Sequence, residues 1–183
     1  DYRWTIQELN LRYEYAVIHF EFTCERERPA SFYERPVGYG TKSDPFRLST
    51  VGELYWFAAF VNQKVTASDL TVEPETACAI LMNDITVNPN LLHTDGTLIG
   101  SHGFERWTPI GYDSKYSGTF EGQGHSISGL YFDHSIASTK HRDIGFVANL
   151  DHGGMVRNLM IMDSWFATPS ADADYYLGGI AGY

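Results

Sequence analysis

Two segments in the second half of the chain recur further along it. IGFVANL at 144–150 aligns with LGGIAGY at 177–183, an offset of 33 residues. GHSISGLYF at 124–132 aligns with GMVRNLMI at 154–161 after a gap of one residue. A repeat of about 30 residues that holds only short strands and turns is too thin to enclose a core alone, so neighbouring repeats must stack. The sequence therefore predicts stacked β-coils, as in a β-solenoid.

The alignment gives each predicted coil an inward side. It matches Ile127 to Val156 and Leu130 to Leu159, both at an offset of 29. Glycines suit the corners between faces, because glycine adopts positive φ without steric cost. The predicted inward residues are Ile127, Leu130, Ile144, Val147, Val156, Leu159, Ile161, Leu177 and Ile180, and the predicted corner glycines are Gly118, Gly122, Gly124 and Gly129.

One helix is predicted, over about 51–62. Thr50 and Glu53 form a capping-box pattern at its start, and Asn62 is predicted to end it. Apolar residues at helical spacing (Leu54, Phe57, Ala58 and Val61) give one stripe, which indicates a lid that packs on a larger apolar surface. No second amphipathic helix separates the short β-type runs, which argues against a βαβ sheet.

The first 38 residues differ from the rest of the chain. In 12–22, apolar residues alternate with polar ones, which predicts a half-buried strand, and two prolines mark the loop that follows. We therefore predict an N-terminal extension over 1–38 and a repeat domain over 39–183.

Composition excludes several classes of function. The net charge of −10 repels phosphate backbones, which argues against nucleic-acid binding. No apolar run approaches the ~20 residues of a membrane helix. The two cysteines, Cys24 and Cys78, leave open one disulfide or two buried thiols, and no pattern typical of a zinc site is present.

Catalytic groups are also sparse in the sequence. No two of the candidate groups are closely spaced carboxylates, which glycoside hydrolysis requires, and GQG at 122–124 precedes an alternating run rather than the helix of a nucleotide site. We therefore predict no catalytic residue, no cofactor and no metal. The candidates weighed are Asp84, Glu121, His125, Asp143 and Asp151.

Two binding alternatives remain open from the residues. Asp172 and Asp174 alternate in a loop, which fits either a Ca²⁺ site or a solvated acidic segment. Aromatic residues fit either sugar-stacking faces or core packing: Trp107, Tyr112, Tyr116, Tyr131 and Trp165.

The order of motifs resembles a known family. WTPIG, YSGTFEGQGHSISGLYF, DIGFVANL and GGMVRNLMIMDS follow one another as in the GLUG-motif repeats of bacterial surface adhesins and IgA-specific metallopeptidases. The resemblance covers about 40–183, although Glu121 stands where the family commonly has Asp. It implies an all-β, right-handed parallel β-helix with one short N-terminal capping helix.

The resemblance also implies a function. The expected protein is a non-catalytic, structural or adhesive module at the cell surface or outside the cell, whose partner is a surface glycan or a host protein. GGIAGY at 178–183 stops in mid-repeat, which predicts either a longer polypeptide or end-to-end assembly. One alternative is a filament subunit whose N-terminal strand adds to the next copy, and another is a β-helical carbohydrate-active enzyme.

Overall fold

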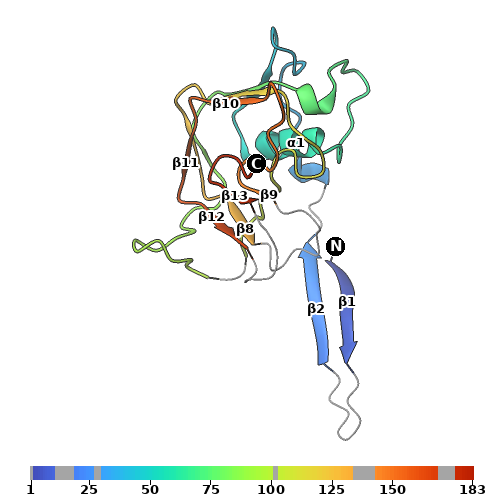
Figure 1. Cartoon of the computed structure of the whole chain (residues 1–183), viewed down its shortest axis with the longest axis vertical. Coiled ribbons are helices and arrows are strands. Elements are labelled where there is room, and N and C mark those ends of the chain that lie inside the picture. The colour runs from blue at the N-terminus through green and yellow to red at the C-terminus, as the bar shows by residue number, and fades with distance from the viewer. Residues whose placement is uncertain (1, 11–18, 27–29, 101–102, 134–142, 169–175) are drawn as a thin grey trace, which may run out of the picture. The chain divides into compact units, whose positions relative to one another are not determined.

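The structure is a computed structural model that describes residues 2–10, 19–26, 30–100, 103–133, 143–168 and 176–183. The chain divides into two compact units, Asp1–Phe32 and Tyr33–Tyr183 (Figure 1). The predicted boundary after residue 38 stays a prediction.

The first unit is a two-stranded antiparallel sheet. Strand β1 (Tyr2–Asn10) pairs with β2 (His19–Arg26), and the register shifts between Ile6 and Leu9. A short 3-10 helix, η1 (Ala30–Phe32), follows. The strand predicted over 12–22 overlaps only the beginning of β2, its residues 12–18 lie outside the described residues, and the sequence analysis missed β1.

The second unit contains short strands in four sheets, and every strand pair in these sheets is parallel. The sheet orders are β10-β6-β4-β3, β11-β7-β5, β12-β8 and β13-β9. The strands are β3 (Phe46–Leu48), β4 (Ala79–Leu81), β5 (Ile85–Thr86), β6 (Thr119–Glu121), β7 (Ser126–Ser128), β8 (Tyr131–Asp133), β9 (Asp143–Ile144), β10 (Met155–Arg157), β11 (Met160–Met162), β12 (Trp165–Ala167) and β13 (Tyr176–Leu177).

This arrangement overturns the predicted all-β, right-handed parallel β-helix. The described strands of the second unit form small, separate sheets of at most four strands, and no closed solenoid is found among them. The single α-helix of the described residues is buried along most of its length. A mixed α/β architecture, with several small parallel sheets and one buried helix, describes this unit better. The prediction failed because the repeat pattern carries no information on how far successive strands continue around a core.

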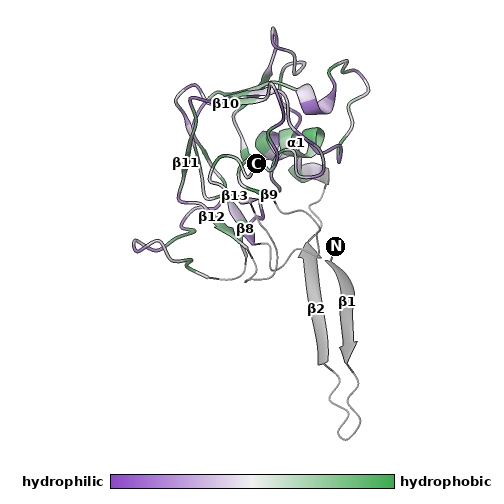
Figure 2. Ribbon diagram, in the orientation of Figure 1, coloured by the Kyte–Doolittle hydropathy of each residue, from purple (hydrophilic) through white to green (hydrophobic). Residues whose placement is uncertain are grey.

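Helix α1 (Val51–Val61) begins and ends as the sequence predicts. The Glu53 N–H donates to Thr50 Oγ1 over 3.1 Å, and the Thr50 N–H donates to Glu53 Oε2 over 3.1 Å, which completes the capping box. Asn62 is the C-cap. Nine of the eleven residues are buried, so the helix is apolar all round and not along one stripe (Figure 2). Neither α1 nor any other described helix is long and apolar enough to cross a bilayer.

Aromatic side chains join α1 to the strands. Phe57 packs edge-on against Tyr116 at 6.1 Å between ring centroids, and its ring is tilted against that of Phe120 at 5.9 Å. Tyr55 packs edge-on against Trp107 at 5.3 Å. These buried rings contribute apolar burial and favourable edge-to-face geometry. A second 3-10 helix, η2 (Pro74–Thr76), lies between α1 and β4.

The predicted inward residues fall into three groups. Ile127, Leu130, Ile144 and Val147 are fully buried, as predicted. Val156, Leu159 and Ile161 are half-buried. The prediction is wrong for Leu177 and Ile180, which are exposed. The alignment that matched Ile127 to Val156 is also wrong, because Ile127 pairs with Ile161 and Val156 pairs with Phe120.

The corner glycines act in two ways. Gly129 has φ +73°, and a Cβ there would lie 2.3 Å from the Asn88 carbonyl oxygen. Gly122 does not have positive φ, yet a Cβ there would lie 2.3 Å from the Asn158 carbonyl oxygen. Glycine is therefore required at Gly122 by the close approach of the next segment.

Candidate interaction surface

The last four strands that the structure describes share an open side. We call β10, β11, β12 and β13 the edge strands, and β6, β7, β8 and β9 the inner strands; each edge strand pairs with one inner strand. The inner strands β6 and β7 also have a second neighbour, β4 and β5 respectively. Among the described residues, no strand pairs with the far side of any edge strand. Their outer backbone N–H and C=O groups are therefore available to another strand.

Inward side chains are fully covered on the inner strands and only partly covered on the edge strands. Ile127 on β7 is fully buried, whereas its partner Ile161 on β11 is half-buried. Phe132 on β8 is 2 % exposed, and its partner Phe166 on β12 is half-buried against the cluster of Tyr112, Phe132, Ile144 and Ala148. The edge strands therefore present an incompletely covered apolar surface.

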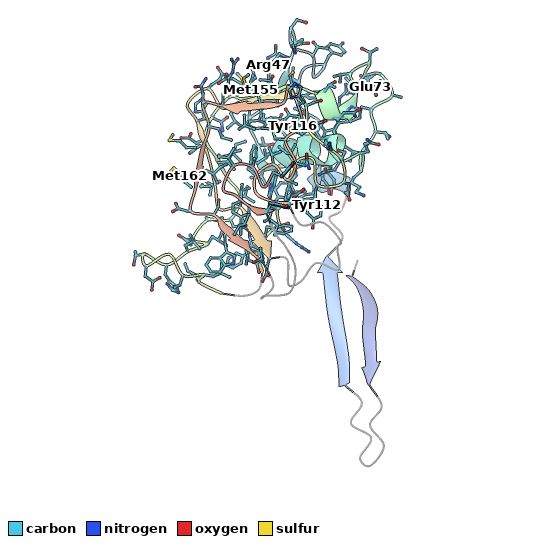
Figure 3. All side chains as sticks on the ribbon, viewed as in Figure 1. Arg47, Glu73, Tyr112, Tyr116, Met155 and Met162 are labelled. Atoms are coloured by element: carbon cyan, nitrogen blue, oxygen red, sulfur yellow. The ribbon has the colours of Figure 1, made fainter. Side chains whose placement is uncertain are left out.

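The outward side chains change in the same place. Met155 pairs with Thr119, Met160 with Ser126 and Met162 with Ser128. The three methionines are 45–51 % exposed. At these paired positions, β6 and β7 thus carry hydroxyl side chains, whereas β10 and β11 carry exposed thioethers. Figure 3 shows Met155 and Met162 on the outside of these strands, away from the interior Tyr116.

A polar corner joins β6 to β10. Glu121 Oε1 accepts hydrogen bonds from the Gln123 N–H and from Asn158 Nδ2, both over 2.9 Å, and Glu121 Oε2 pairs with Arg157 Nε. The Asn158 amide, followed by the Gln123 N–H and Arg157, lowers the pKa of Glu121. This corner therefore holds the edge strands to the inner strands through a carboxylate that is ionised at neutral pH.

Side-chain amides make similar connections at successive corners. Asn83 Nδ2 donates to the Ser49 carbonyl over 3.1 Å, and Gln123 Nε2 donates to the Leu81 carbonyl over 2.7 Å. A shallow, open depression lies beside the last of these corners, lined by Gln123, Gly124, Asn158, Leu159 and Met160.

Asp84 and His125, weighed as catalytic candidates, do come together. Asp84 Oδ1 lies 3.4 Å from His125 Nδ1 and accepts the Ser126 N–H over 2.8 Å. The Ser126 N–H is the main cause of the lowered pKa of Asp84. Asp84 therefore connects the segment after β4 to β7, which is a structural role.

The other candidate acids lie apart from this corner. Asp143 Oδ2 accepts Asn149 Nδ2 over 3.4 Å, and Asp151 Oδ1 lies 3.6 Å from Lys115 Nζ. A hydrogen bond from the His152 backbone N–H, and then Lys115, lower the pKa of Asp151. Asp143 therefore makes a contact within its own segment, and Asp151 makes an ion pair with the segment before β6. Asp172 and Asp174 lie outside the described residues.

Aromatic and sulfur candidates are largely in the core. Trp107, Tyr112, Tyr116 and Tyr131 are buried, so they cannot stack on a sugar in this structure, and Trp165 is half-buried. Burial raises the pKa of Tyr116 well above its usual range, and its hydroxyl donates to the Ala77 carbonyl over 3.0 Å. Cys78 is a free, buried thiol. Cys24 belongs to the other unit, so the disulfide alternative stays open. In the described part of the chain, no three His, Cys, Asp or Glu side chains gather as a metal site.

The sequence analysis missed the exposed thioethers. MVRNLMIM at 155–162 was read for its inward residues only, although its outward positions hold three of the four methionines of the chain. The signal was present, because Met160 and Met162 flank the inward Ile161 and so occupy outward positions of the strand.

Comparisons with known proteins add no identity. No family model matches the sequence, and neither a curated protein nor a solved structure matches the chain. Any function proposed for this chain therefore rests on its own residues and geometry.

Proposed function

We propose that this chain is a non-catalytic structural module that associates with a second copy of itself through the open side of its edge strands. The observation that carries the proposal is the contrast between paired residues. Ile127 is fully buried while Ile161 is half-buried, and Phe132 is buried while Phe166 is half-buried. A further strand on β11 and β12 would cover both edge residues and pair the free backbone groups.

The first unit supplies a donor for this association. A two-stranded sheet alone is marginally stable in water, because it has too few neighbours to bury a face. Strands β1 and β2 pair only with each other among the described residues. A hairpin from one copy and the edge strands of another are therefore complementary, since each lacks the strand neighbour that the other offers.

Charge favours the same surface. The chain carries a net charge of −10, so two copies repel each other over most of their surfaces. The segment 155–168 contains only Arg157 and Asp163 as charged residues, and they cancel. The edge strands β10–β12 are thus a place where two acidic copies can approach without added repulsion.

The setting we propose is extracellular, in a cell-surface structural or adhesive protein. This part of the proposal is supported by the order of sequence motifs over 40–183, which resembles that of the GLUG-motif repeats of bacterial surface adhesins. A surface glycan or a host protein is the alternative partner, and it would contact the same exposed strands.

Sedimentation velocity over a wide concentration range tests the proposal. We expect reversible association that weakens in Ile161→Lys, because an inward-pointing charge on an edge strand blocks strand addition. Thr66→Lys, on an exposed loop, makes the same charge change and should leave association intact. Thr23→Pro in β2 should also weaken association, because proline removes a backbone donor from the hairpin.

Two results would count against the proposal. One is a parent protein that remains monomeric at every concentration. The other is association that Ile161→Lys and Thr66→Lys affect equally. Monomeric protein that binds a purified surface glycan would instead support the adhesive alternative.

A further inference from the structure

The four methionines of the chain share one unusual property. Met82, Met155, Met160 and Met162 are each about half exposed, although methionine is an apolar residue. Three of them lie on β10 and β11, and Met82 follows β4, two strands away from β10. We define Met155, Met160 and Met162 as the methionine face.

The methionine face is continuous with the open edge. Within β10 and β11, its residues alternate with the inward residues Val156 and Ile161. Successive side chains of a strand point to opposite faces. The same two strands thus present an uncovered inward side, an apolar outward side and a free backbone edge.

On the paired inner strands, the outward positions opposite the methionines hold polar residues. Thr119, Ser126 and Ser128 occupy the same register positions on β6 and β7. Ser128 Oγ lies 3.0 Å from Thr86 Oγ1 on β5, so hydroxyl groups continue across this sheet until β11. The change to thioether therefore coincides with the strand that has no further neighbour.

We infer that the methionine face is part of the self-association surface, so that a second copy covers the outside of β10 and β11 as well as their edge. This inference rests on the proposed self-association and specifies where the partner lies. Methionine is flexible and polarisable, so it adapts to an irregular partner surface. The shallow depression beside Met160, lined also by Gln123, Gly124, Asn158 and Leu159, continues the same contact area.

The segment that covers the methionine face in this inference is the two-stranded first unit of a second copy. Strand addition at β10 or β11 would place the added strand next to Met155, Met160 and Met162, because neighbouring strands lie about 5 Å apart. The partner hairpin then gains apolar contact on one face and backbone pairing at one edge. The low net charge of 155–168 permits this approach between two acidic chains.

Oxidative footprinting of the whole chain tests this inference with an internal control. Hydrogen peroxide transfers one oxygen atom to an accessible thioether sulfur, which gives methionine sulfoxide and water. At low concentration all four methionines should oxidise. At concentrations where the protein associates, Met155, Met160 and Met162 should be protected while Met82 continues to react, as quantified by peptide mass spectrometry.

A matched set of variants gives a second readout. Met155→Thr, Met160→Ser and Met162→Ser, combined, copy the residues at the paired inner positions and so keep the strands compatible with their register. We expect the dissociation constant of the associated form to rise about tenfold or more, through lost apolar burial. Met82→Thr should leave it unchanged. Thermal unfolding of each variant at low concentration reports on folding.

The outcomes separate this inference from the proposed function. Association without protection of the methionine face, together with unchanged association in the triple variant, would overturn the inference and leave strand addition at the edge intact. A parent protein that does not associate at all would overturn both.

Discussion

The inner strands and the edge strands have the same parallel register but different surroundings. Ile127 and Ile161 are the same residue type at paired positions on β7 and β11, and only Ile127 is fully buried. The same holds for Phe132 and Phe166 on β8 and β12. The difference is therefore one of neighbours and not of residue type.

The comparison shows how this unit accumulates stability. Strands β4 and β5 pair with β6 and β7 on one side, and an edge strand pairs with each inner strand on the other. Helix α1 packs against β6 through Phe57 and Phe120. Each additional strand buries the inward residue of the strand before it. The last strands gain the least, so the same side chain contributes to stability on an inner strand and to association on an edge strand.

Alanine substitution at the two isoleucines should give the largest effect. Ile127→Ala removes a fully buried side chain and should lower the free energy of unfolding by about 2–5 kcal/mol. Ile161→Ala should cost about 1 kcal/mol, because the half-buried side chain loses less contact and water fills the space. Urea unfolding at low protein concentration measures both.

Measuring the two variants at increasing protein concentration makes this prediction more specific. If a second copy covers the edge strands, Ile161→Ala should become more costly as the parent protein associates, whereas Ile127→Ala should not. Equal costs for the two variants in the monomer would contradict the contrast between inner and edge strands.

The close approach of β6 and β10 should give an intermediate effect. In Gly122→Ala the new methyl group would lie 2.3 Å from the Asn158 carbonyl oxygen, so the edge segment must move away. We expect a loss of about 1–3 kcal/mol in the free energy of unfolding, as in other overpacked sites. Gly179→Ala, where a Cβ meets nothing within 4 Å, is the control and should change it by less than ~0.5 kcal/mol.

The Gly122→Ala measurement also tests how tightly the segment around Asn158 is held against the corner after β6. A neutral Gly122→Ala would show that the segment around Asn158 is free to shift, and the inner and edge strands would then be less tightly joined than the structure indicates.

Local signals in the sequence predicted local structure well. Thr50 and Glu53 predicted the start of α1, and Gly129 predicted a corner with positive φ. The repeat of IGFVANL correctly placed Ile144 beside Leu177. These features depend on a few neighbouring residues, whose chemistry is visible in the sequence.

Features that depend on distant neighbours could not be predicted in the same way. The repeat alignment paired Ile127 with Val156, whereas Ile127 pairs with Ile161 in the structure. Insertions between repeats shift the strand register, and the sequence alone does not show where they lie. It also assigned Leu177 to the core, although burial depends on what lies beyond the edge strand. The predicted overall architecture is wrong for the same reason. The sequence pattern gives α1 one apolar stripe, whereas nine of its eleven residues are buried, because its burial depends on Tyr116, Phe120 and other distant rings.

The acid dependence of the Glu121 corner should be the smallest effect. Glu121→Gln keeps the shape but removes the charge that pairs with Arg157, and it weakens the hydrogen bonds from Asn158 and the Gln123 N–H. At neutral pH we expect a loss of about 1 kcal/mol in the free energy of unfolding. Because the folded-state pKa of Glu121 is depressed, its contribution is fully present above the unfolded pKa of about 4.3 and is lost as pH falls through the folded pKa.

The parent protein and Glu121→Gln should therefore converge in stability at acid pH, as measured by urea unfolding over a pH series. Glu73→Gln removes the same charge on the exposed loop before η2 and is the matched control at neutral pH, where it should leave the free energy of unfolding close to that of the parent protein. A Glu121→Gln cost that stays constant from neutral to acid pH would mean that shape, and not charge, joins β6 to β10. The inner and edge strands would then be held together by backbone pairing alone, and the polar corner would contribute only to the fit of the turn.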